Sequence, residues 1–207
     1  MASAISQNEI VYRAIKNDVV EGRYMPGQRL ESRVLSERHA SSNTPVRMAL
    51  SRLVGERLVE IHPNDGFHIP MVTEKSVRDL FVAARISLDS CIELLSSKAD
   101  DTASRIGQLA GFPFERAISA LFTDIALAAD NDVLIGDVEN HNDRSLLLRR
   151  LDGSLDADRG SEVSALQATW QAGDLRELKS QLNGFHRTLI FNIPEVVKLA
   201  YLPRKQR

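Results

Sequence analysis

The segment that most constrains the fold of this chain is residues 42–50, with the sequence SNTPVRMAL. Ser42 is a polar residue of the kind that caps helices, and Pro45 is tolerated in a first helical turn, where its missing N–H is not needed. Val46, Leu50 and Leu53 follow at spacings of four and three residues. Such spacing puts apolar side chains on one helical face. The sequence therefore predicts a helix over residues 43–56 with one buried face and one free face.

Arg47 lies near the beginning of this predicted helix. The backbone N–H groups of a helix N-terminus attract anions, and an arginine beside them is well placed to bind a phosphate or a base edge. We therefore interpret residues 43–56 as a DNA-recognition helix.

The flanking sequence completes a known structural unit. Amphipathic or helical spacing predicts two earlier helices, and two β-prone runs follow the recognition helix, joined by a loop rich in turn residues. The predicted elements are helices over 8–21 and 31–39, a turn over 24–30, strands over 58–61 and 67–69, and a hairpin loop over 62–66. Three helices and a hairpin form a winged helix-turn-helix, with the hairpin as its wing.

The order of matched residues in this region resembles the DNA-binding domain of the GntR family of bacterial transcription regulators. The matched positions, within residues 8–70, are Pro26-Gly27, Leu30-Glu31, Leu35, Ser42, Thr44-Pro45-Val46-Arg47, Ala49-Leu50, Leu53, Leu58-Val59 and Gly66-Phe67. The resemblance implies that operator DNA is contacted by Arg33, Ser42, Asn43, Thr44 and Arg47. It also implies that the wing position Gly66 approaches the minor groove.

Two residues depart from the family pattern, because Asn43 stands where arginine is usual and Met48 where glutamate is usual. Arginine pairs with guanine and asparagine with adenine, and each pair is worth about 1–3 kcal/mol of discrimination. We therefore hypothesise an operator with A·T where related proteins prefer G·C. A second interpretation is that Asn43 caps the helix or binds a phosphate. Arg33 and Arg47 could likewise be solvated surface residues.

Charge alone would not reveal a DNA-binding protein. The chain has a net charge of −2, and residues 1–72 hold nine Lys or Arg against eight Asp or Glu. Residues 29–57 hold six positive charges against three negative ones, and all six are arginines. Arginine suits forked contacts to bases and phosphates. We therefore expect specificity to come from the motif and not from a broad basic field.

The length allows two domains, for which we expect the boundaries 1–70 and 71–207. The single cysteine, Cys91, lies on an apolar helical stripe, which predicts a buried thiol and fits a reducing compartment. The sequence has no recognisable signal peptide and no apolar stretch long enough to span a membrane, so we expect a cytoplasmic protein.

From Thr73 onward the pattern is helical. Thr73 is predicted to cap a long helix, and breaks at glycine, proline or asparagine separate the segments that follow. The predicted further helices cover about 102–110, 113–129, 132–150, 161–172, 174–192 and 194–202. The expected fold class is therefore mainly α, with an N-terminal winged helix-turn-helix followed by an all-α six-helix bundle.

The second half resembles the effector-binding domain, of the FCD type, of the FadR-like branch of the GntR family. The matched residues are Leu80-Phe81, Arg85, Leu88-Asp89, Asn131, Val133-Leu134 and Ala172-Gly173-Asp174. The resemblance implies a small carboxylate effector, often with a divalent metal held by one Asp and three His. Those ligand positions fall on Gly111, on Glu115, near Glu162-Val163 and near Phe185-His186. Because most of the nitrogen ligands are replaced, no metal or other cofactor is expected, and Glu115 and His186 are the remaining metal candidates.

A metal-free effector site remains a hypothesis, with Arg85, Glu115, His141 and His186 as its candidate residues. Arg85 lies on an apolar stripe, so its cation needs either an acidic ligand or a carboxylate such as Asp89 or Glu115. His141 and His186 are open to a second interpretation as hydrogen-bonded core histidines. The acidic segment 152–162 lacks full calcium-loop spacing and is expected to be a solvated linker.

Together these features predict a cytoplasmic homodimer that binds double-stranded operator DNA, acts as a repressor and responds to a small acidic metabolite, with no membrane partner. One alternative is a ligand-independent or protein-regulated DNA-binding dimer with a degenerate effector pocket. A metal-dependent enzyme is a weaker alternative, because the sequence has no nucleophile elbow, phosphate loop or two-histidine metal motif.

Overall fold

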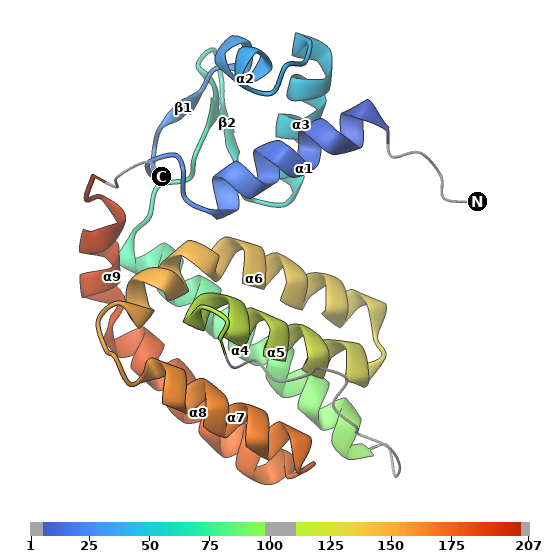
Figure 1. Ribbon diagram of the computed structural model, residues 1–207, viewed down its shortest axis with the longest axis vertical. Helices are drawn as coiled ribbons and strands as arrows, with labels where there is room; N and C mark the ends of the chain where they lie inside the picture. Colours follow the sequence, from blue (N-terminus) through green and yellow to red (C-terminus); the bar gives the residue numbers. More distant parts are fainter. Residues whose placement is uncertain (1–5, 98–110, 204–207) are drawn as a thin grey trace. The chain divides into compact units, whose positions relative to one another are not determined.

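A computed structural model describes residues 6–97 and 111–203 of the chain. It divides into two units, one formed by residues 1–72 with 200–207 and the other by residues 73–199. Figure 1 shows the helices and strands of both units. The predicted helix over 102–110 lies outside the described residues.

The first unit contains the three predicted helices, α1 (Gln7–Val20), α2 (Ser32–Arg38) and α3 (Asn43–Gly55). Helix α3 packs on α1 and α2 through its apolar face. Val46, Leu50 and Leu53 are fully buried, as is Ile15 of α1. The period of the apolar residues therefore orients α3 as the sequence predicted.

A small sheet follows the helices, with the strand order β1-β3-β2. Strands β2 (Glu60–His62) and β3 (Gly66–His68) are the predicted hairpin, and β1 (Arg29–Leu30) pairs with β3 in antiparallel register. The sequence predicted a turn and no strand at β1. Two residues give no local pattern, and β1 forms only because β3 offers its free edge as a partner.

A buried carboxylate ties α1 to the segments around it. Asp18 receives an ion pair from Arg23 at 3.0 Å, and its second oxygen lies 3.3 Å from His39 and 3.4 Å from the hydroxyl of Tyr24. Because a buried charge is tolerated only with partners, this cluster specifies where the end of α2 sits against α1.

The regular elements among the described residues of the second unit are all helices. Its helices are α4 (Glu74–Ser97), α5 (Phe114–Ala129), α6 (Asp132–Gly153), α7 (Arg159–Gln171), α8 (Leu175–Phe191) and α9 (Ile193–Ala200). Helices α4, α5 and α6 pack on one another, α8 packs on α4, and α7 packs on α5 and α8 (Figure 1). The mainly α fold class with an N-terminal winged helix-turn-helix is confirmed.

Polar caps set the helix boundaries in this unit. The Oγ1 atom of Thr73 accepts a hydrogen bond from the N–H of Ser76, as the predicted cap of α4 should. Asn131 accepts from the N–H groups of Val133 and Leu134, and Asp174 accepts from that of Glu177. The residues that matched the family pattern at these turns are thus helix caps.

The core of the second unit combines apolar side chains with buried polar contacts. Trp170 is fully buried, and its Nε1–H donates to Asp124 at 2.7 Å. Cys91 is buried as predicted, and burial raises the pKa of its thiol to about 11. No helix among the described residues is long and apolar enough to cross a membrane.

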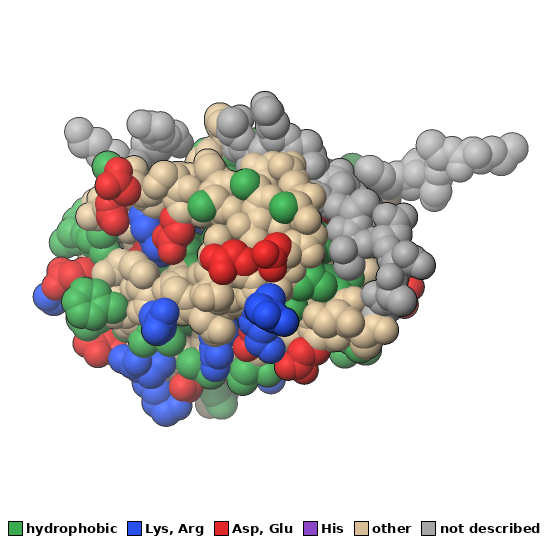
Figure 2. All heavy atoms as spheres, turned by 90° about the horizontal axis from the view of Figure 1, so that it is seen from below, with side chains coloured by type: hydrophobic (Ala, Val, Ile, Leu, Met, Phe, Trp, Pro, Cys, Tyr) green, Lys and Arg blue, Asp and Glu red, His purple; other side chains and the backbone are tan. Residues whose placement is uncertain are grey.

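The surface of the second unit mixes charges of both signs with apolar side chains, as one face seen in Figure 2 shows. The most exposed large apolar residues there are Phe191, with 84% of its surface accessible, and Val133, with 73%.

Candidate nucleic-acid interface and candidate ligand site

The free face of α3 carries an open hollow of about 460 Å³. Thr44, Arg47, Met48 and Ser51 line it, and their spacing of three and four residues places them on one stripe. All four side chains are exposed. Arg47 makes no hydrogen bond or ion pair with any residue that the structure describes, so its guanidinium is available to a partner.

The N-terminus of α3 lies beside this stripe. Ser42 is the N-cap residue by backbone geometry, but its side chain makes no capping hydrogen bond. Asn43 is the first helical residue and not the cap, and its Oδ1 atom accepts from the Oγ of Ser36 at 3.0 Å. The interpretation of Asn43 as the helix cap is therefore wrong. Contacts of Asn43 with a base or a phosphate remain open.

Arg33 projects from α2 with 87% of its side chain exposed and pairs with Glu37 at 3.2 Å. An exposed ion pair of this kind contributes about 0–1 kcal/mol, so a phosphate could replace Glu37 at little cost. Other arginines of this region serve the fold. Arg52 stacks on Tyr12 at 3.5 Å and pairs with Glu9 at 2.9 Å, and Arg38 contacts Tyr24. Two of the six arginines in residues 29–57 thus make contacts that stabilise the fold of the first unit.

Gly66 begins β3 at the end of the wing loop. Its φ of +87° lies in the left-handed region, and no atom lies within 4 Å of where a Cβ would be. The position therefore favours glycine for its backbone conformation and not for lack of space. The nearby loop residue Asn64 also has a positive φ, of 64°.

In the second unit, the partners of Arg85 lie within the protein, as the interpretation of an internal salt bridge expected. Its side chain is 38% exposed, lies 3.4 Å from Asp89 and donates to Asn183 at 3.2 Å. Glu115 is buried but pairs with Arg150 at 2.7 Å and not with Arg85. The structure therefore gives both groups internal partners and does not bring them together.

A residue that the sequence reasoning missed, Arg149 of α6, occupies the interior instead. Arg149 is 1% exposed, donates to the hydroxyl of Ser119 at 3.1 Å and to the side-chain Oδ1 of Asn142 at 2.8 Å, and stacks on Phe122 at 4.9 Å. None of these partners is a carboxylate. Burial without a counter-charge lowers the pKa of Arg149 to about 9. Arg149 lies four residues after Ser145, a position that helical spacing could have placed on the inward stripe.

His186 of α8 contacts the same phenylalanine. It is 1% exposed, its ring stacks on Phe122 at a centroid distance of 5.9 Å, and its Nδ1 atom lies 2.8 Å from the carbonyl oxygen of Leu182. Burial lowers the pKa of His186 to about 4, and the charge of Arg149 adds to this effect. His186 is therefore neutral at pH 7. Its Nδ1 donates to Leu182, which leaves Nε2 as an acceptor.

Several buried polar atoms of the second unit have no hydrogen-bond partner among the described residues. They include the Oγ of Ser145, the Nε of Arg149, the Nε2 of His186 and the Oε1 of Gln181. Buried polar groups are almost always paired, so such atoms call for a physical explanation. His141, the fourth predicted candidate, is half-buried on α6.

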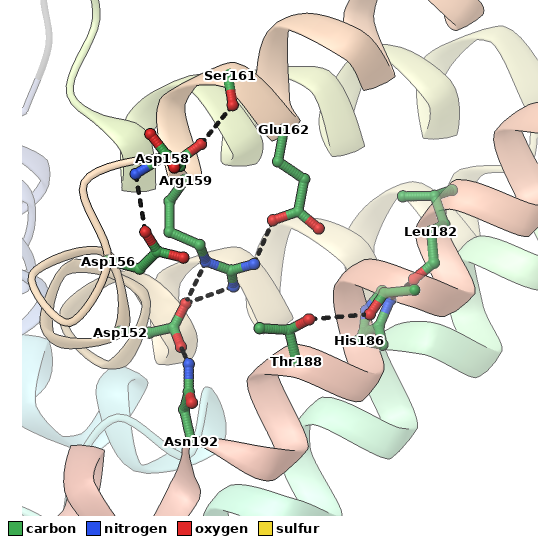
Figure 3. A network of polar contacts seen from close by, with 11 residues as sticks. Asp152, Asp156, Asp158, Arg159, Ser161, Glu162, Leu182, His186, Thr188 and Asn192 are labelled. Atoms are coloured by element: carbon green, nitrogen blue, oxygen red, sulfur yellow. Dashed lines mark hydrogen bonds and ion pairs between the residues drawn. The ribbon is translucent and has the colours of Figure 1, made fainter.

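A second buried arginine is fully neutralised. Arg159 donates to Asp152 at 3.0 Å and also pairs with Glu162, while Asn192 donates to the other oxygen of Asp152 at 2.8 Å (Figure 3). Asp152 and Arg159 are both buried. The expectation of a solvated linker over 152–162 is therefore wrong at Asp152 and Arg159, because their ion pair joins α6 to α7 inside the unit.

These pairings also bear on the metal candidates. Glu115 and Glu162 each lie against an arginine, and His186 belongs to no group of three or more potential metal ligands among the described residues. Among the described residues, the only group of three potential metal ligands is His62, Asp65 and His68 in the first unit. The absence of a metal at Glu115 and His186 stays a prediction.

Comparisons with known proteins agree on the first unit. Residues 7–69 match the family described as bacterial regulatory proteins, gntR family. The HTH-type transcriptional repressor GlaR of Escherichia coli (strain K12) is 34% identical over 85 residues, which are 41% of this chain and 38% of the relative. The HTH-type transcriptional regulator BphR of Paraburkholderia xenovorans (strain LB400) is 37% identical over 89 residues, 43% of this chain and 36% of the relative. The chain thus matches less than two fifths of the length of these two relatives. Both are named as regulators and not as enzymes.

Solved structures resemble nearly the whole chain. A GntR-type transcriptional regulator from Rhodococcus sp. RHA1 has a TM-score of 0.71 at 14% identity and covers 92% of this chain and 99% of its own. The E. coli protein McbR/YncC has a TM-score of 0.59 at 20% identity, with 95% and 99% covered. At these identities the likeness shows the fold alone.

The buried, neutral state of His186 predicts how stability depends on pH. Unfolded His186 takes up a proton near pH 6.5, whereas native His186 does so only near pH 4. The unfolded state therefore binds more protons between these values. The free energy of unfolding should be fully retained above pH 6.5 and should fall by about 1.4 kcal/mol per pH unit towards pH 4.

Urea unfolding followed by the fluorescence of Trp170, the single tryptophan, measures this dependence in the second unit. The His186→Gln variant is the control and should show a shallower slope over the same range. An equal slope in both proteins would contradict the assignment.

Proposed function

We propose, from the premise that residues 7–69 are a DNA-binding domain of the GntR family, that the whole chain is a sequence-specific transcription regulator. It acts as a repressor and binds its operator as a homodimer. The observation that carries this proposal is the exposed stripe on α3, where Arg47 has no partner among the described residues and lies near the N-terminus of the helix.

In this proposal α3 enters the major groove. Its stripe of Thr44, Arg47, Met48 and Ser51 faces the base edges, and Ser42 and Asn43 lie where the helix begins. Arg33 adds a phosphate contact from α2, because its pair with Glu37 is exposed and easily exchanged. The wing at Gly66 approaches the adjoining minor groove.

Two subunits would read two half-sites, because the symmetry of a dimer is mirrored in its operator. Exposed apolar side chains of the second unit, such as Phe191 and Val133, support a contact between subunits.

Selection of random DNA duplexes by the purified chain tests the proposal. We expect a near-palindromic sequence with two inverted half-sites. Arg47→Ala should bind it about 5- to 160-fold more weakly, because a specific arginine contact is worth about 1–3 kcal/mol. If Arg47 binds a phosphate, the slope of log K against log salt should also fall by about 0.9.

Arg176→Ala is the matched control, because Arg176 is an exposed arginine of α8 in the second unit. Its affinity should stay close to that of the wild type. Failure to select any sequence, or equal binding by Arg47→Ala and the wild type, would contradict DNA recognition by α3. A single half-site would contradict the homodimer.

Asn43 generates a separate prediction about the sequence that is selected. Its amide can pair with adenine, so one position of each half-site should prefer A·T. A base-substitution series gives the preference, and Asn43→Arg should shift it to G·C at that position. If no position prefers A·T, Asn43 binds a phosphate or nothing.

For the second unit we propose control by a small acidic ligand that bears a hydroxyl group. The unpaired Nε of buried Arg149 supports an anion, because a guanidinium without a carboxylate is costly inside a protein. The Nε2 of His186 is an acceptor and so suits a donor such as a hydroxyl. The Oγ of Ser145 adds a third polar group. This set replaces Arg85 and Glu115, which have internal partners, and keeps His186.

Such a ligand would act by binding the operator-competent and operator-incompetent states with different affinity, through the junction at residues 71–73. A second candidate function is a ligand-independent or protein-regulated DNA-binding dimer. The internal ion pairs of Arg85, Glu115 and Arg159 favour it, because they satisfy charges that a ligand would otherwise meet.

Thermal unfolding with glycolate and with acetate separates the two candidates. Glycolate has the hydroxyl and acetate lacks it, so glycolate should raise the melting temperature more, in proportion to RT ln(1 + [ligand]/Kd). Arg149→Met keeps most of the side-chain volume and should abolish both shifts. Arg85→Met is the control and should retain them. No shift with either acid at millimolar concentration would favour the ligand-independent dimer.

A further inference from the structure

One face of the wing carries two histidines and two carboxylates. His62 pairs with Gly66 and Glu60 pairs with His68 in the antiparallel register of β2 and β3. Residues two apart on a strand point to the same side, and so do paired residues on neighbouring strands. Glu60, His62 and His68 therefore share one face of the hairpin.

The wing loop adds Asp65 to this face. The N–H of Asp65 donates to the carbonyl oxygen of His62 at 3.2 Å, and the residues on either side of it, Asn64 and Gly66, have positive φ angles. This tight turn directs Asp65 back over the strands. Its Oδ2 atom lies 3.1 Å from the Nε2 of His68.

The two imidazole rings lie against each other. Their centroids are 4.5 Å apart and their planes differ by 20°. One potential ligand atom each from His62, Asp65 and His68 lies within 4.8 Å of the other two. The spacing is regular in sequence as well, since two residues separate His62 from Asp65 and two more separate Asp65 from His68.

We propose that His62, Asp65 and His68 bind a divalent transition metal of the Zn²⁺ class. Two imidazole nitrogens and a carboxylate oxygen are ligands that such ions prefer, and three protein ligands leave a position for water or another oxygen. In a tetrahedral site with bonds of about 2.0–2.1 Å, ligand atoms lie about 3.4 Å apart. The three side chains therefore have to close by little more than an ångström.

The different exposure of the three ligands fits this closure. The side chain of His68 is 9% exposed and is held in place, with its Nδ1 atom 3.3 Å from the carbonyl oxygen of Gly66. The side chains of His62 and Asp65 are 50% and 56% exposed, so they can rotate towards a metal on His68. Glu60 lies 3.5 Å from the Nε2 of His62 and adds negative charge beside the site.

A metal-free explanation of the cluster is an exposed network of ion pairs. Arg29 lies 3.5 Å from Asp65, with 58% of its side chain exposed. Pairs this exposed contribute about 0–1 kcal/mol. A metal bound by three ligands would displace Arg29 from Asp65.

Zinc binding by the metal-stripped full-length chain, measured by calorimetry near neutral pH, tests the site. We expect one Zn²⁺ per chain at the wing. His62→Ala and Asp65→Asn should each weaken binding by more than about tenfold, because even outer-shell partners of a metal are worth that much. Both residues are exposed, so the variants should keep the circular dichroism of the wild type.

His141→Ala is the matched control, because it removes a histidine from the second unit and leaves the wing intact. Cys91 is no competitor, since burial raises the pKa of its thiol to about 11. The proposal is overturned if the wild type binds no zinc, or if His62→Ala and Asp65→Asn bind it as the wild type does. Loss of binding in His186→Gln with retention in His62→Ala would place the metal in the second unit instead.

The consequence for DNA rests on the proposed function. A Zn²⁺ ion would cancel the charge of Asp65 and Glu60 where the wing approaches phosphates, so zinc should tighten operator binding and steepen its salt dependence. His62→Ala should lose this response and keep its metal-free affinity. A chain that binds zinc at the wing but selects no DNA would refute the regulator and leave the metal site standing.

Discussion

The burial of one face of α3 is the constraint on which the DNA-facing surface depends. Val46, Leu50 and Leu53 are completely buried, and their spacing leaves one orientation for the helix on α1. The opposite stripe, which contains Arg47, is exposed as a direct consequence. A slip in the apolar period would turn Arg47 towards the core, where a guanidinium without a partner is costly. The same helical repeat therefore buries one face of α3 and exposes the stripe proposed to contact DNA.

The second unit treats its buried arginines in two ways. Arg159 meets Asp152 and Glu162, so its charge is cancelled and its contribution is to join α6 to α7. Among the residues that the structure describes, Arg149 meets a hydroxyl, an amide oxygen and an aromatic ring and no carboxylate. Neutral partners satisfy its hydrogen bonds in part but leave its charge, which is why burial lowers its pKa to about 9. Arg159 is therefore part of a structural ion pair, whereas Arg149 is a candidate ligand-binding residue.

The sequence predicted the features that depend on neighbouring residues. Helix α3, the hairpin and the cap at Thr73 all follow from patterns within a few positions. Strand β1 was missed because its two residues are extended only through pairing with β3. Arg149 was missed because buried positions on α6 were predicted from apolar residues at helical spacing. An arginine in such a position normally indicates an exposed residue. Asp152 and Arg159 pair across a loop, so their spacing within a helix could not predict the pair.

The wing loop closes the hairpin and at the same time places Asp65 beside His68. Gly66 needs a positive φ to close the loop, and the same closure turns Asp65 over His68. Without a cation, the face then presents Asp65 and Glu60, with Arg29 beside Asp65, to the phosphates that a wing approaches. Two carboxylates in that place oppose DNA binding through like-charge repulsion. The two histidines beside them offer a chemical means of reversing the sign, since neutral imidazoles bind a metal ion without adding further negative charge. The arrangement therefore makes the charge of the wing depend on what its histidines hold.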